Sequence, residues 1–145
     1  MTDKKRVPRE FPLEPALLAL LREHLPEGTL SSRELSARAG GGQVAVAGMA
    51  VARQRPATAN GVVFMLLEDE LAQVNLIIAP QVYERFRAVV RGEPLLLVRG
   101  RYEHADRNRN VVVRELVGLV PLARELTEGA DVHGSLPNAH HFGHR

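Results

Sequence analysis

Hydrophobic residues alternate with polar or small residues in several short runs between Val44 and Leu119. Successive side chains of a strand point to opposite faces of a sheet, so this period of two predicts strands with one buried face. One stretch between these runs has apolar residues at helical spacing instead. The expected segments are strands at 44–55, 62–67 and 74–79, a helix at 80–90, and strands at 95–103 and 110–119.

Three strands, a helix and two strands is the element order of the OB-fold, a small barrel that commonly binds oligonucleotides. The expected fold class is therefore mainly β, a five-stranded barrel with a capping helix between the third and fourth strands. Gly48 interrupts the alternation of the first strand, which predicts a bulge or a sharp bend. Tyr102 shares its parity with Leu96 and Val98, so it is expected in the barrel core.

Two short helices are predicted before the barrel. Leu17, Leu21 and Leu25 form a stripe on the first, and Ser31 with Glu34 forms the capping box of the second. These helices carry too few apolar residues for a core of their own, so they pack on the barrel or on a neighbouring domain. The expected organisation is a flexible arm at 1–12, a helical linker at 13–42, the barrel at 43–122 and a largely disordered tail at 123–145.

The composition of the 145 residues excludes several kinds of functional site. There is no cysteine, which excludes disulfides, thiolate zinc sites and a cysteine nucleophile, and is compatible with a reducing cytoplasm. No apolar run approaches the length of a membrane span, so no membrane association is expected. The net charge is only +2, but all basic residues except Lys4 and Lys5 are arginines, whose planar groups bind phosphates and stack on bases.

No arrangement of residues indicates catalysis. The serines lie at predicted caps or in the tail, and none is part of a nucleophile elbow. The acidic segment Glu68–Glu70 is interpreted as a solvated turn rather than a magnesium site, because nothing else supplies convergent oxygen ligands. The histidines at 140, 141 and 144 are expected to hold no functional metal, because a tail predicted to be flexible gives them no fixed geometry. The sequence therefore predicts no metal, no cofactor and no enzymatic activity.

The face formed by strands two and three is the expected binding surface, because OB-folds bind single strands there between the 1–2 and 4–5 loops. Phosphates need cations along a groove, and bases need flat surfaces on which to stack. Two other interpretations stay open: the N-terminal helices cover Phe64, or the arginines are only solvated edge and loop residues. The candidate nucleic-acid-binding residues are Arg53, Arg55, Asn60, Phe64, Asn75, Arg99, Arg101, Arg107 and Arg109.

Three runs together carry a family resemblance: RQRPATANGVVFMLLEDE, NLIIAPQVYERFRAVV and LLLVRGRYE. They resemble the C-terminal OB domain of bacterial error-prone DNA polymerases, relatives of the polymerase III alpha subunit, and LLREHLPEGTLSSREL resembles the linker before it. The resemblance extends over residues 16–120 and implies a module that holds single-stranded template during translesion synthesis. The same OB group includes anticodon-binding domains of aminoacyl-tRNA synthetases. By that resemblance Phe64 stacks on a base, and Asn75 lies near a residue that reads a base edge.

Some positions depart from the family pattern. Asn60 stands where the polymerases usually have lysine, Leu71 and Ala72 replace a Thr-Gly turn, and Ala79 replaces a frequent aromatic residue. Each change is expected to weaken DNA binding or indicates relaxed constraint on the sequence. The polymerase palm has no counterpart here, so the leading hypothesis is a non-catalytic module that binds single-stranded DNA. The alternatives are an RNA- or tRNA-binding module, and a protein-interaction module that docks a polymerase or accessory factor through the leucine stripe.

Overall fold

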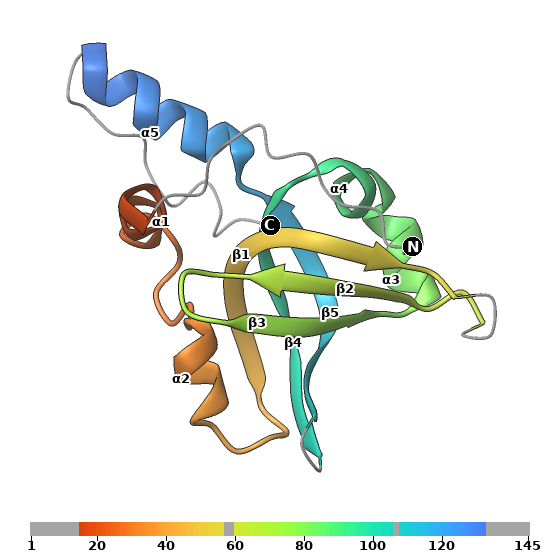
Figure 1. The fold of residues 1–145 in the computed structure, drawn as a ribbon. Coiled ribbons are helices and arrows are strands. Elements are labelled where there is room, and N and C mark those ends of the chain that lie inside the picture. The colour runs from red at the N-terminus through yellow and green to blue at the C-terminus, as the bar shows by residue number, and fades with distance from the viewer. Residues whose placement is uncertain (1–14, 57–59, 106–107, 133–145) are drawn as a thin grey trace.

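The computed structural model describes residues 15–56, 60–105 and 108–132 (Figure 1). The arm predicted at 1–12 and the tail beyond residue 132 lie outside the described residues. The elements, in chain order, are α1 (Pro15–Arg22), α2 (Ser32–Ser36), β1 (Gln43–Gln54), β2 (Val63–Glu68), β3 (Gln73–Ile78), α3 (Pro80–Arg85), α4 (Arg87–Gly92), β4 (Leu95–Ala105), β5 (Asn108–Gly118) and α5 (Val120–Val132).

The five strands form a closed barrel in the order β1-β2-β3-β5-β4. Neighbouring strands are antiparallel, except that β3 and β5 pair in parallel. The helical segment between β3 and β4 packs against the barrel core, and two short helices precede β1. The predicted fold class, a mainly β, OB-like barrel, is confirmed.

β1 serves two sides of the barrel. Its residues up to Gly48 pair with β4, and those from Met49 onward pair with β2. A Cβ atom at Gly48 would lie 2.5 Å from the carbonyl oxygen of Glu68, so only glycine allows this backbone approach. The predicted interruption at Gly48 is thus the point where the strand changes partner, and the bulge itself lies between Ala50 and Ala52.

The first hydrophobic core fills the barrel with the inward side chains of all five strands. Tyr102 is 0% exposed, as its parity predicts, and its hydroxyl has no hydrogen-bond partner among the described residues. The expected helix at 80–90 is two helices, because Phe86 leaves helical geometry with φ −117° and ψ 27°. Tyr83 and Val90 are its buried residues, and they pack against the barrel core.

A second hydrophobic core lies outside the barrel, where α1 and α5 pack over β1 and β4 (Figure 1). It explains the unbroken apolar run Leu95–Val98, because β4 is buried on both faces there. The prediction of a disordered tail was wrong for residues 123–132, which belong to α5. The buried residues Leu119, Leu122, Ala123 and Leu126 have helical spacing, and Pro121 lies in the first turn.

The linker is attached to the barrel through the turn between β2 and β3. The capping box of Ser31 and Glu34 forms as predicted. The interpretation of the acidic turn as solvated was wrong for Asp69, which is only 8% exposed. Its carboxylate accepts hydrogen bonds from the amide and hydroxyl of Ser32, at 2.6 and 2.7 Å, and pairs with Arg22 at 3.2 Å. The turn therefore fixes α2 against the barrel.

Candidate nucleic-acid interface

Side chains that point outward from the end of β1, from β2, from β3 and from the start of β5 form one surface, called here the open face. Strand register places them in two rows that cross the four strands. The first row is Gln54, Phe64, Ile77 and Val112, and the second is Ala52, Leu66, Asn75 and Asn110. Most of these residues line a hollow of about 380 Å³. The open face has no charged residue among these eight.

Phe64 is accessible at the centre of the open face, with 37% of its surface exposed. The N-terminal helices do not cover it, because α1 packs over β1 and β4, and α2 contacts β1. Among the described residues, the other exposed large hydrophobic side chain is Leu71, in the turn at the opposite end of β2. An exposed aromatic ring in the middle of a sheet face is a suitable platform for stacking.

Amide side chains surround this ring. Asn75 lies in the second row, as predicted from the alternation of β3, with Asn110 beside it on β5. Gln54 stands next to Phe64 on β1. Sequence reasoning missed Gln54 and Asn110 as site residues. Their parity, opposite to Arg53 and to Val111, would have placed both on the outer face, but the order of strands was needed to bring them beside Phe64 and Asn75.

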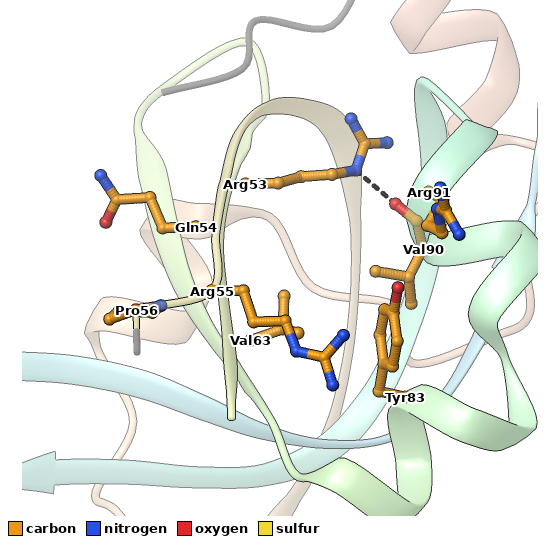
Figure 2. Close-up of a pocket in the computed structure, with 8 residues that line it drawn as sticks. All are labelled: Arg53, Gln54, Arg55, Pro56, Val63, Tyr83, Val90 and Arg91. Carbon is orange, nitrogen blue, oxygen red and sulfur yellow. Dashed lines mark hydrogen bonds between the residues drawn. The ribbon is translucent and has the colours of Figure 1, made fainter. Parts of the chain in front are cut away.

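Arg53 lies on the other side of β1 and is half-buried. Its Nε donates to the carbonyl oxygen of Val90 (Figure 2). Its Nη2 donates to the carbonyl oxygen of Glu93 at 2.9 Å. These carbonyls belong to the C-terminal end of α4, where unpaired carbonyls and the helix dipole favour a cation. Burial lowers the pKa of Arg53. Arg53 was predicted to bind phosphates. Two of its N–H donors instead attach α4 to the barrel.

Arg55 directly follows β1, and its side chain extends toward the same side as that of Arg53 (Figure 2). Its guanidinium carbon lies 4.7 Å from the centre of the Tyr83 ring, within the range of a cation–π interaction. Arg53, Arg55 and Arg91 line a cavity of about 620 Å³, called here the basic pocket (Figure 2). Gln54 lines both the basic pocket and the hollow of the open face. The two sites are therefore adjacent around the end of β1.

The arginines of β4 do not lie on the β2–β3 face, because β4 stands between β5 and β1. Arg101 pairs in register with Val112, so it extends the first row by one strand and forms an ion pair with Glu103. Arg99 forms an ion pair with Glu115 at 2.8 Å. Arg99 also lines a smaller cavity, together with residues of β1, on the β1–β4 side of the barrel. Arg99 and Arg101 were expected on the same face as Phe64. Neither lies beside it, because β4 does not pair with β2 or β3.

The loop residues are placed as follows. Asn60 is exposed and has a left-handed backbone, with φ 55°, followed by Gly61 with φ 86°. Arg109 is exposed beside Asn110 at the start of β5. Arg107 lies outside the described residues. The predicted 4–5 loop over residues 104–109 was too long, because β4 continues to Ala105 and β5 begins at Asn108.

Neither a metal site nor a membrane span is found in the described part of the chain. No three His, Asp or Glu side chains there gather closely enough to hold a metal ion. The helices of these segments are also too short or too polar to cross a membrane.

No protein-family model matches the chain. Curated relatives do. The error-prone DNA polymerase of Anaeromyxobacter sp. (strain K) is 46% identical over 114 residues, which is 78% of this chain and 10% of the relative. Error-prone DNA polymerase 1 of Rhizobium meliloti (strain 1021) is 41% identical over 66% of this chain and 8% of its own length. The error-prone DNA polymerase of Pseudomonas fluorescens (strain Pf0-1) is 40% identical over 83% of this chain and 12% of its own length.

Solved structures share the barrel. Asparaginyl-tRNA synthetase from Pyrococcus horikoshii has a TM-score of 0.52 and 20% identity, over 65% of this chain and 24% of that one. OBody AM1L10, solved in complex with hen egg-white lysozyme, has a TM-score of 0.52 and 18% identity. The match covers 66% of this chain and 94% of the OBody. At these identities the likeness establishes the fold alone. The chain spans about a tenth of the polymerases that it matches. It is therefore an OB-like barrel domain homologous to part of the error-prone DNA polymerases.

Proposed function

We propose that the open face binds single-stranded DNA, and that this domain supplies non-catalytic template binding to a polymerase of the error-prone type. The observation that carries the proposal is the exposure of Phe64, 37%, at the centre of an uncharged sheet face. An aromatic ring in this position gains a stacking partner when a base lies on it. Stacking of this kind contributes about 1–3 kcal/mol per base and tolerates every base.

The rest of the open face suits the edges of a base. Gln54, Asn75 and Asn110 each carry an amide that can donate and accept hydrogen bonds. No carboxylate among the eight face residues repels a phosphate. Arg109 is exposed at the edge of the face beside Asn110, where it can meet the backbone of a strand. Homology to DNA polymerases supports the same class of ligand.

We expect weak, salt-sensitive binding. Asn60 offers no cation in the 1–2 loop, and Arg53 uses two of its donors within the protein. Phe64 is the exposed aromatic side chain of the face, so a single stacked base supplies most of the affinity that does not depend on charge. A cationic contribution falls with salt in proportion to the number of phosphates contacted.

Fluorescence anisotropy with a labelled oligo-dT, at low and at moderate salt, tests the proposal. Phe64→Ala should weaken binding by about 5- to 150-fold, the equivalent of 1–3 kcal/mol of stacking. Leu71→Ala is the matched control, because it removes an exposed hydrophobic side chain of the same hairpin away from the face. Absence of binding at low salt, or equal effects of the two variants, would refute the proposal.

Competition separates the remaining alternatives. An RNA oligomer that displaces oligo-dT more effectively than DNA would assign the face to RNA. Docking of a partner through the leucine stripe is disfavoured, because Leu21 and Leu25 are buried in the second core. A pull-down of a polymerase that survives Phe64→Ala but not a change on α1 would restore that alternative.

A further inference from the structure

The basic pocket lies between the end of β1 and the wall formed by α3 and α4. Its volume of about 620 Å³ is in the range of sites that take small molecules. Figure 2 shows the side chains of Arg53, near the end of β1, and of Arg55, just after it, both extending toward this wall, where Tyr83 and Arg91 lie. The pocket faces the inward side of β1, whereas the open face lies on the outward side.

The residues that line the basic pocket carry positive charge. Three of its lining residues are arginines and none is acidic. Among the described residues, neither Arg55 nor Arg91 forms an ion pair with a carboxylate. Arg53 is held by two neutral carbonyl groups, which fix its position and leave its charge in place. Cations that line a concave wall attract an anion.

Tyr83 forms part of the same wall. It lines the basic pocket, and the residue is only 8% exposed. Arg55 lies over the face of its ring, an arrangement that orients the planar guanidinium and leaves N–H groups at its edge. The wall therefore presents mainly hydrogen-bond donors, which suits a ligand whose oxygens only accept.

We propose that the basic pocket binds a phosphate monoester, supplied either by the end of a nucleic-acid strand or by a free nucleoside monophosphate. A monoester carries close to two negative charges near neutral pH and three acceptor oxygens. Three guanidinium groups match it better than they match an internal phosphodiester, which has one charge. Val63 and Val90 give the pocket an apolar part that can contact the sugar or base. Gln54 connects the pocket to the open face, so the end of a bound strand can reach it.

Calorimetric titration of the full chain with thymidine monophosphate and with thymidine tests the pocket without reference to the open face. The monophosphate should bind at least about tenfold more tightly, as expected for charge-assisted hydrogen bonds. Arg91→Gln should abolish that difference. Arg87→Gln is the matched control, since Arg87 lies on the same helix, is exposed and pairs with Glu84 outside the pocket. Arg87→Gln should retain the difference.

Anisotropy with oligo-dT that carries a 5′-phosphate, a 3′-phosphate or neither identifies the source. Preference for one phosphorylated end assigns the pocket to the strand terminus. Tight binding of the monophosphate without such preference assigns it to a free nucleotide. If the monophosphate binds no better than thymidine and neither terminal phosphate helps, or if Arg91→Gln and Arg87→Gln act alike, the proposal is wrong. Phe64→Ala should not alter the monophosphate result, so failure of the open face is distinguishable from failure of the pocket.

Discussion

Replacement of Asp69 by alanine removes the acceptor that joins the helical linker to the β2–β3 turn. One carboxylate oxygen accepts from the Ser32 amide at 2.6 Å, and the other from the Ser32 hydroxyl at 2.7 Å. The second oxygen also accepts from the amides of Leu71 and Ala72, at 2.9 and 3.0 Å. The same side chain therefore closes its own turn and holds the first residue of α2.

The magnitude follows from the exposure of the donors. Ser32 is 2% exposed, so water cannot replace the lost acceptor for its amide and hydroxyl. A buried donor without a partner costs about 1–3 kcal/mol. The amides of Leu71 and Ala72 belong to exposed residues and can turn to water. We expect Asp69→Ala to lower the free energy of unfolding by about 3–5 kcal/mol, a large part of the 5–15 kcal/mol typical of a domain.

Two further variants make the test specific. Asp69→Asn keeps one acceptor oxygen but places an NH₂ group opposite donors, so we expect about half of the loss. Glu70→Gln is the matched control on the same turn. It weakens the partly exposed pair with Arg22, which should cost less than about 1 kcal/mol.

The pH dependence of stability gives an independent readout. Burial alone would raise the pKa of Asp69, but hydrogen bonds from Ala72, Ser32 and Leu71 outweigh it and lower the pKa. The unfolded chain then binds the proton at a higher pH than the folded chain. The contribution of Asp69 is complete above its ordinary pKa of 3.8 and is lost as the pH falls through the lower, folded value. The difference in stability between wild type and Asp69→Asn should shrink over that acidic range.

Urea unfolding followed by circular dichroism measures these differences, with the midpoint expected to fall at an unchanged slope. The reasoning is refuted if Asp69→Ala and Glu70→Gln differ by less than about 1 kcal/mol, because two buried donors would then have found other partners. A gap between wild type and Asp69→Asn that stays constant down to acidic pH would refute the pKa assignment.

Three further predictions can be checked by the same unfolding assay. Gly48→Ala should cost about 2–4 kcal/mol, because its Cβ would meet the Glu68 carbonyl oxygen at 2.5 Å, whereas Gly92→Ala, where a Cβ meets nothing within 4 Å, should be nearly neutral. Tyr102→Phe should be neutral or stabilise by about 1 kcal/mol, since it removes a buried hydroxyl that lacks a partner; a loss above 1 kcal/mol would indicate a hidden partner. Leu126→Ala should cost about 2–5 kcal/mol by opening a cavity in the second core, and no loss would mean that α5 is not docked.

Local patterns predicted the elements of the barrel well. Alternation in β2 and β3 assigned Val63, Met65 and Leu76 to the inside and Phe64 to the outside, because strand parity is fixed by covalent geometry. The capping box at Ser31 was equally local. The segment that forms α5 was predicted to be mostly disordered tail, although its buried residues Leu119, Leu122 and Leu126 have helical spacing. Pro121 occupies a first turn, where proline is tolerated.

Local patterns could not predict which residues lie together at the binding site. Whether Arg99 and Arg53 share a face with Phe64 depends on strand order and on which side of β1 each points. Arg53 has inward parity, but only the position of α4 determines that two carbonyls receive its guanidinium. Asp69 likewise looked solvated, because its partner Ser32 lies 37 positions earlier in the chain. Long-range partners of polar side chains are not encoded in local period or propensity.

The position of the second core has a practical consequence for immobilised assays. α1 and α5, the first and last described helices, both pack over β1 and β4, on one side of the barrel (Figure 1). A sensor chip or a bead that holds the protein through either helix should therefore leave Phe64 turned toward the solution. Coupling through the β2–β3 hairpin, at Leu71 for example, would place the surface of the chip much closer to the open face. Orientation of the tether is thus a variable that binding measurements on this barrel can control.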